Sequence, residues 1–292
     1  MSSRIALGVV GLGSDWTDLI GPRIAANPRI RLAALYDFSY LRTQQVAREC
    51  SLRPFGSASR ILAHPGVRAL VCCSLGWRPQ LVDRFLESGK PVFLSERALE
   101  TLPSDLGPLL GRVEETGAIV CPDLSWRYTP ATLRLRELMA VHLGPAVEIR
   151  ISLPDSLPKL LPAMLDWCRI VTGGRTCPVP HRSGTALHLD LDRAVARITC
   201  HHAEGEALDP ALAAVPNWIV QCERGVAILR GEHQIEWSTG EEARVESLEE
   251  ERSRLDVNLD LFFRRVVGGL VPAPTLLDVK LAREAAASVS LA

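Results

Sequence analysis

Short apolar runs alternate with longer amphipathic stretches through the first 121 residues. The apolar runs lie at residues 6–10, 32–36, 69–73, 92–94 and 118–121, and stretches suited to helices lie between them at 17–26, 39–50, 80–87 and 106–116. This alternation is typical of βαβ units, in which helices cover both faces of a parallel sheet. We therefore predict an α/β domain over residues 1–121.

The pattern changes in residues 122–292. Residues 131–139 have the spacing of a helix, and strict apolar–polar alternation follows at 147–152, 187–192 and 196–201. Period-two alternation indicates strands of an open, mostly antiparallel sheet with one covered face. Residues 217–222 and 226–229, joined around Gly225, read as a hairpin, and two helices are predicted from 259 and from 276. We expect the charged segment 241–254 to be a solvated loop or a helix start.

Composition and charge narrow the class of protein. The chain has 292 residues, a formal net charge of −1 and 47% hydrophobic residues, which excludes disorder and gives no basic excess for nucleic acid. It has no apolar run of about 18 residues, and its N-terminus lacks the apolar segment of a signal peptide. Eight cysteines without a C-x-x-C pair indicate reduced, buried thiols. We expect a cytoplasmic protein without a membrane segment and, because its histidines lack ligand spacing, without a metal.

A glycine pair lies where a dinucleotide fingerprint belongs, between the first strand and the first helix. Gly11 and Gly13 allow a tight turn whose N–H groups can approach a pyrophosphate, and Asp37 ends the second strand, where a carboxylate favours NAD over NADP. Trp16 replaces the third glycine, and Asp15 places a carboxylate where phosphate would bind. Two alternatives follow: a sheet that binds NAD (or NADP), or one that no longer binds a cofactor.

The order of several segments resembles the glucose–fructose oxidoreductase / inositol dehydrogenase (Gfo/Idh/MocA) family over nearly the whole chain. The segments that carry the resemblance are LAALYD, ILAHPGVRALVCC, FLESGKPVFLSERALE, WRYTPATLRLRELM, LDWCRIVTGG and LFFRRVVGGLVPAPTLLDVKLAREAAASV. The resemblance implies a Rossmann domain, residues 1–121, and an α/β domain with an open sheet, residues 122–292. It also implies NAD(P)-dependent oxidation or reduction of a sugar-like hydroxyl compound. The cofactor-binding residues would be Gly11, Gly13, Asp37, Ser74 and Glu96.

The positions that carry catalysis in this family are altered. The family's Glu-Lys-Pro motif reads Glu96-Arg97-Ala98, and a guanidinium cannot exchange a proton at neutral pH. In the family's D-x-x-x-H-x-x-D pattern only the last Asp is kept, as Asp166, with Lys159 at the first position. The candidate catalytic residues are therefore Arg97, Lys159 and Asp166. The loop between the strand ending at 153 and the helix starting at 165 is expected to be short and proline-rich.

The resemblance also places residues along a substrate cleft. Arg78 stands at the position of a family histidine, and Trp126, Arg127 and Trp167 are expected to line the same cleft. Several arginines near one cleft would favour an anionic or sugar-like small molecule. Two functional readings remain open: an NAD(P)-dependent oxidoreductase with an unusual site, or a non-catalytic member that binds a ligand or a partner protein. We also expect a homo-oligomer formed through the open sheet, whose polar face would carry Arg150, Arg197 and His201.

Overall fold

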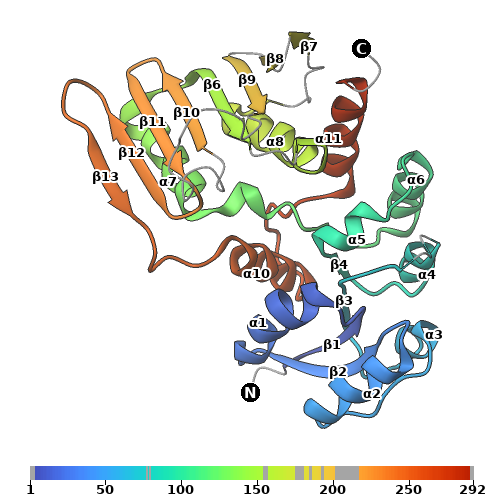
Figure 1. Ribbon diagram of the computed structural model, residues 1–292. Coiled ribbons are helices and arrows are strands. Elements are labelled where there is room, and N and C mark those ends of the chain that lie inside the picture. The colour runs from blue at the N-terminus through green and yellow to red at the C-terminus, as the bar shows by residue number, and fades with distance from the viewer. Residues whose placement is uncertain are drawn as a thin grey trace. The chain divides into compact units, whose positions relative to one another are not determined.

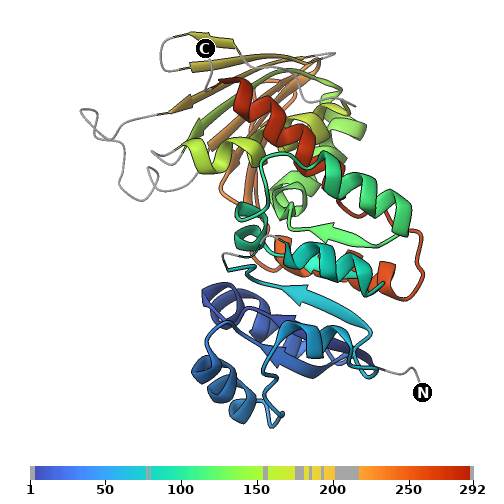
Figure 2. The same ribbon diagram turned by 90° about the vertical axis from the view of Figure 1, so that its right-hand side faces the viewer.

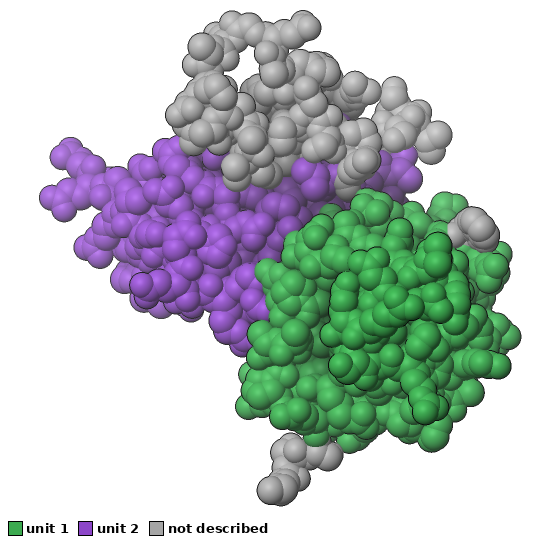
Figure 3. All heavy atoms as spheres, turned by 60° about the horizontal axis from the view of Figure 1, so that its bottom comes forward, with its two compact units in different colours: residues 1–123, 258–280 green, residues 124–257, 281–292 purple. Residues whose placement is uncertain are grey.

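The structure is a computed structural model that describes two compact units. The described residues are 4–76, 78, 80–153, 157–174, 181–183, 186–191, 194–200 and 217–289. Unit 1 comprises residues 1–123 and 258–280, and unit 2 comprises residues 124–257 and 281–292 (Figure 3). Each unit has its own sheet, as predicted, and each is described separately below.

Unit 1 is built on a five-stranded parallel sheet of order β2-β1-β3-β4-β5 (Figure 1). Its elements are β1 (Ile5–Val10), η1 (Asp15–Ile20), α1 (Gly21–Ala26), β2 (Ile30–Tyr36), α2 (Tyr40–Glu49), α3 (Ala58–Leu62), β3 (Ala69–Cys72), α4 (Leu81–Glu87), β4 (Val92–Leu94), α5 (Glu96–Glu100), α6 (Gly107–Thr116) and β5 (Val120–Pro122). The strand order reverses between β1 and β3, which is the position where open α/β sheets bind ligands at the carboxyl ends of their strands.

Local sequence explains why these elements form and end where they do. All six residues of β1 are buried, as expected for a parallel strand covered on both faces. Gly8 lets α3 approach this strand, because a Cβ at Gly8 would lie 2.7 Å from Ile61. Ser39 and Ser95 cap α2 and α5 by accepting backbone N–H hydrogen bonds.

Residues 258–280 pack on unit 1 although they lie far beyond residue 121 in the sequence. The helix α10 (Arg254–Val266) places Phe262 against Phe93 of β4, with ring centroids 5.8 Å apart. The buried Asn258 donates a hydrogen bond to the carbonyl of Pro122 at the end of β5. The sequence predicted one boundary at residue 121, which would place residues 258–280 in the second unit. The contacts of α10 with β4 and β5 place this segment in unit 1.

Unit 2 has an eight-stranded mixed sheet of order β13-β12-β11-β10-β6-β9-β8-β7 (Figures 1 and 2). Its elements are η2 (Ser125–Tyr128), α7 (Pro130–Leu138), η3 (Met139–Leu143), β6 (Ala146–Leu153), α8 (Leu157–Thr172), β7 (His181–Ser183), β8 (Ala186–Leu191), β9 (Ala194–Cys200), β10 (Asn217–Cys222), β11 (Gly225–Arg230), β12 (Gln234–Ser238) and β13 (Arg244–Ser247). A last helix, α11 (Leu276–Val289), begins in unit 1 and ends in unit 2. All strand pairs in this sheet are antiparallel except β6 with β9.

Three details of the sequence prediction are corrected. Residues 157–164 of the segment expected as a proline-rich loop belong to α8, which starts at Leu157 and contains Pro162. The segment 241–254 contains a strand, β13, at the edge of the sheet. The helix expected from residue 17 starts at Asp15 with a π-helical turn. The hairpin at residues 217–230 is confirmed as β10 paired with β11.

Candidate functional site

The glycine turn, residues 11–15, follows β1 at the carboxyl edge of the unit 1 sheet. Gly11 donates its N–H to the carbonyl of Tyr36 at 2.9 Å and has a φ of +86°. A Cβ at Gly11 would lie 2.6 Å from the backbone nitrogen of Ser74, so β1 and β3 can approach only because this residue is glycine. Ser74, a predicted cofactor residue, therefore forms one wall of the turn.

The turn is open on its other side. No heavy atom lies within 4 Å of a Cβ built on Gly13, and Ser14 is exposed. Among the described residues, none accepts a hydrogen bond from the N–H of Gly13 or Ser14. Backbone N–H groups in such a turn are suitable partners for the oxygens of a pyrophosphate. The glycine turn thus fits the diphosphate of a dinucleotide.

Asp37, at the end of β2, is 6% exposed and is held by backbone groups. Its Oδ2 accepts the N–H of Leu12 at 2.7 Å, and its Oδ1 accepts the N–H of Ser39 at 2.7 Å. Arg42 lies 3.5 Å from both oxygens. The carboxylate therefore ties β2 to the glycine turn, and its negative charge at this position disfavours a 2′-phosphate.

Asp15 does not face away from the sheet but contacts the loop after β4. Its Oδ2 accepts a hydrogen bond from the hydroxyl of Ser95 at 2.7 Å, and its Oδ1 lies 3.5 Å from Nε of Arg97. The Asp15 side chain is 15% exposed and that of Arg97 is 57% exposed. Arg97, which was predicted to replace the family's lysine, is therefore paired with Asp15 of the glycine turn.

A second carboxylate, that of Asp123, follows β5 at the same edge of the sheet. Burial raises the pKa of the Cys73 thiol well above its ordinary value, and the charges of Cys72, Asp15 and Asp123 raise it further. The thiol after β3 therefore lies within electrostatic range of Asp15 and of Asp123, which follows β5. The carboxylates of Asp15 and Asp123 thus lie near this buried thiol at the carboxyl edge of the sheet.

Trp16 does not lie in the glycine turn. Its side chain is buried and packs on Gly21, where a Cβ would lie 3.1 Å from the indole. The first turn of the helix is π-helical, and the N–H of Gly21 donates to the carbonyl of Trp16, five residues earlier. The residue at the position of the third fingerprint glycine is thus a buried indole packed against Gly21.

Two further predicted residues lie on unit 1. Glu96 is exposed and begins α5, next to Ser95. Arg78 is exposed, and its guanidinium lies over the ring of Phe38 at 5.9 Å from the centroid. That ring also lies 3.1 Å from the position of a Cβ on Gly76. Phe38, which follows Asp37, thus lies against the loop that follows β3.

In unit 2, Asp166 lies at the centre of a buried ion cluster. Arg127 donates two hydrogen bonds to it, from Nε and from a terminal nitrogen, both at 2.6 Å. Arg169 donates a third at 3.0 Å, and all three side chains are at least nine-tenths buried. The structure brings together two predicted site residues, Arg127 and Asp166, as a bidentate pair. Arg169 was not predicted, although its i,i+3 spacing from Asp166 is visible in the sequence.

The predicted tryptophans belong to an aromatic cluster in the same unit. Trp167 is fully buried and donates to the hydroxyl of Thr132 at 2.8 Å. Trp218 lies between Trp126 and Trp167, with centroid distances of 5.7 and 5.9 Å. The guanidinium of Arg254 stacks on Trp126 at 4.1 Å from the ring centroid. Sequence analysis missed Trp218 and Arg254, which come from a distant strand and from the start of α10.

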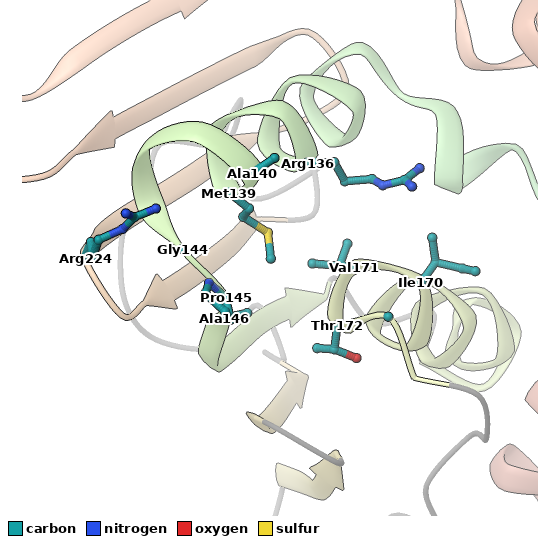
Figure 4. A pocket seen from close by; sticks show the side chains of 11 residues that line it. Arg136, Met139, Ala140, Gly144, Pro145, Ala146, Ile170, Val171, Thr172 and Arg224 are labelled. Carbon is teal, nitrogen blue, oxygen red and sulfur yellow. The ribbon is translucent and has the colours of Figure 1, made fainter.

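The remaining predicted residues lie elsewhere. The backbone of Lys159 belongs to the first turn of α8, and its side chain lies outside the described residues, as does His201. Figure 4 shows a pocket of about 500 Å³ in unit 2, between the C-terminal ends of α7 and α8, with Arg136 and Arg224 among its lining residues. This pocket contains none of the predicted site residues.

Other site types find no support in the part of the chain that is described. No group of three metal-ligating side chains occurs there. No helix among those residues has both the length and the apolar content that a membrane crossing requires. The six cysteines whose side chains are described are free thiols, and burial raises the pKa of Cys72 to about 12.

The chain matches no protein-family model and no curated protein. Its structure is similar to several solved oxidoreductases over nearly its whole length. UDP-N-acetylglucosamine 3-dehydrogenase GnnA from Acidithiobacillus ferrooxidans has a TM-score of 0.76 and 16% identity, with 99% of this chain and 97% of that chain covered.

Aldose-aldose oxidoreductase from Caulobacter crescentus, complexed with glycerol, has a TM-score of 0.75 and 15% identity, with 98% of this chain and 96% of that chain covered. GenD2 from gentamicin A biosynthesis, in complex with NAD, has a TM-score of 0.75 and 16% identity, with 100% and 94% covered. At such identities the likeness shows the fold.

Proposed function

We propose, from the Gfo/Idh/MocA-type fold that this chain has, that it is an NAD-binding homologue of these oxidoreductases. Its dehydrogenase chemistry, on an anionic or sugar-like substrate, would be weakened. The observation that carries the proposal is the glycine turn. It keeps the tight approach of Gly11 to Ser74 and presents the N–H groups of Gly13 and Ser14 to an open space.

The residues of unit 1 would divide the binding of the cofactor between them. The N–H groups of Gly13 and Ser14 would hold the diphosphate, and Asp37 would exclude the extra phosphate of NADP. NAD supplies the hydride acceptor, or in reduced form the hydride donor. GenD2, which has the same fold, was solved with NAD.

The weakened chemistry follows from the two described catalytic candidates. Arg97 keeps its proton at neutral pH, and its guanidinium is paired with Asp15. Both oxygens of Asp166 already accept hydrogen bonds from arginines. Hydride transfer from a hydroxyl compound also requires removal of a proton, and neither group is suited to accept one.

The same observations support a second candidate, a non-catalytic protein that keeps the fold and binds a ligand or a partner. The experiment that tests both is a calorimetric titration with NADH and then with NADPH. The protein is then supplied with oxidised NAD and a panel of sugars and sugar acids, and hydride transfer from their hydroxyl groups is followed as a rise in NADH absorbance. Micromolar binding with turnover supports the dehydrogenase. Binding without turnover on any compound supports the second candidate, and absence of binding at millimolar cofactor contradicts both an NAD site and the first candidate.

We also propose a homo-oligomer formed through the open face of the unit 2 sheet. Ile219 on β10 is 36% exposed and is paired across the strands with Arg150 of β6 and Ile228 of β11. Such a mixed apolar and charged face suits a two-fold contact with a second copy. Light scattering after size-exclusion chromatography would detect the oligomer, and Ile219→Asp should shift it toward the monomer. A monomeric wild type would contradict the proposal.

A further inference from the structure

The acidic side chain of the glycine turn is held in place by groups from another strand. Ser95, after β4, donates to Asp15 at 2.7 Å, and Arg97 lies 3.5 Å from its second oxygen. Ser95 is itself fixed because it caps α5, where its hydroxyl accepts the N–H of Ala98 at 3.3 Å. Asp15 is therefore a built-in anion at a fixed position and not a freely rotating surface carboxylate.

The position of this anion determines what it can do. Asp15 directly follows Gly13 and Ser14, whose N–H groups have no acceptor among the described residues, so a diphosphate bound by those groups lies close to its carboxylate. Like charges a few ångströms apart repel, and they repel more strongly at a protein surface than in bulk water. Arg97 offsets only part of this repulsion, because the pair is 3.5 Å apart and Arg97 is more than half exposed.

We infer that Asp15 is a specificity-determining residue, which weakens the binding of dinucleotide diphosphates at the glycine turn, and that Arg97 serves to hold and neutralise Asp15. This inference rests on the proposed function, since it assumes that the diphosphate binds at the glycine turn. It assigns Arg97 a positioning role in place of the catalytic role predicted from the sequence. The inference predicts that NADH binds more tightly when the charge of Asp15 is removed. A purely structural role of Asp15 predicts no such gain.

The test is a calorimetric titration of NADH into the full chain and into three variants. Asp15→Asn removes the charge and keeps an oxygen that can accept the Ser95 hydroxyl, so we expect NADH to bind at least about fivefold more tightly. Asp18→Asn is the matched control. It makes the same charge change in the same helical turn, where Asp18 is exposed and accepts only the neighbouring Thr17 hydroxyl in the described contacts, so we expect less than a twofold change.

Arg97→Met is the third variant, and its expected change in NADH affinity is opposite in sign to that of Asp15→Asn. It leaves Asp15 unneutralised, so NADH binding should weaken. The gain in Asp15→Asn should also shrink as salt is raised from 50 to 500 mM, because a repulsion between charges is screened. Far-ultraviolet circular dichroism and thermal melting establish that each variant is folded before it is titrated.

The possible results separate the inference from the function on which it rests. If wild type binds NADH and a folded Asp15→Asn binds no more tightly, the inference is overturned and the proposed function stands. The inference is also overturned if Arg97→Met binds more tightly than wild type. If neither wild type nor Asp15→Asn binds NADH or NADPH at millimolar concentration, the proposed function itself is overturned.

Discussion

Arg127 and Asp166 form a bidentate pair in which both hydrogen bonds measure 2.6 Å and both side chains are buried. Arg169 completes a cluster of two guanidiniums around one carboxylate. This carboxylate joins η2 and α8, and its removal would take a shared acceptor away from two buried guanidiniums. The geometry therefore gives Asp166 a large part in the stability of unit 2.

Asp166→Ala should lower the free energy of unfolding by about 3–5 kcal/mol, because the two arginines stay buried without their partner. Urea unfolding followed by tryptophan fluorescence measures this loss. Asp190→Ala is the control, since Asp190 is an exposed carboxylate of the same unit and should cost less than about 0.5 kcal/mol. Equal stability of the two variants would contradict the structural role of the cluster.

Gly11 and Gly13 give a matched pair of substitutions in one turn. Gly11→Ala places a methyl group 2.6 Å from the Ser74 nitrogen at a φ of +86°, so we expect a loss of at least about 2 kcal/mol. Gly13→Ala meets no atom within 4 Å and should change stability by less than about 1 kcal/mol. Its methyl group should instead weaken NADH binding. The prediction fails if Gly11→Ala melts at the wild-type temperature.

Asp37→Asn should change cofactor preference. Removing the negative charge at the end of β2 should raise the affinity for NADPH relative to NADH about tenfold. The measurement is the ratio of the two dissociation constants from calorimetry. One of the two backbone hydrogen bonds to Asp37 is also lost, so the variant should be less stable by about 1–3 kcal/mol. An unchanged ratio would show that Asp37 does not face the ribose.

Glu246 should make unit 2 sensitive to acid. The hydrogen bond from Arg134 lowers the pKa of Glu246 below its ordinary value of 4.5. A carboxyl with a depressed folded-state pKa stabilises the fold above pH 4.5, and this stabilisation is lost as the pH falls through the folded-state pKa. Glu246→Gln should therefore cost roughly 1 kcal/mol at pH 7.

Urea unfolding of wild type and Glu246→Gln between pH 3.5 and 8 tests this dependence. The difference between the two proteins should be constant above about pH 5 and should shrink below pH 4.5. The exposed Glu241, replaced by Gln, is the control and should show no such difference. A difference that persists unchanged at the lowest pH would contradict the assignment.

The sequence predicted the parts of the fold that follow from local periodicity. The strands of unit 1 are buried on both faces, so they read as uninterrupted apolar runs such as residues 69–72. The strand β13 was missed because it is a short edge strand whose only apolar residue is Val245. The start of α8 was missed because Pro158 and Pro162 suggest a loop. Pro158 lies in the first turn, where proline is tolerated, whereas Pro162 lies inside the helix.

The candidate site depends more on contacts that no local pattern contains. The fingerprint position of Gly11 and Gly13 was visible, because a turn between a strand and a helix has a known sequence form. The contact of Asp15 with Ser95 joins residues 80 positions apart, and the pair of Arg127 and Asp166 joins residues 39 positions apart. Such contacts are set by the order of strands in the sheet and by helix packing, which a single sequence does not encode locally.

The tryptophan cluster of unit 2 gives the chain a built-in optical reporter. Indole rings 5.7–5.9 Å apart couple their electronic transitions, so Trp126, Trp167 and Trp218 should contribute a strong near-ultraviolet circular dichroism band that vanishes when their mutual packing is lost. Trp16, next to Asp15 on the helix after the glycine turn, is a fluorescent side chain of unit 1. Melting of the one unit and ligand binding at the other can therefore be followed by separate spectroscopic signals in the unlabelled protein.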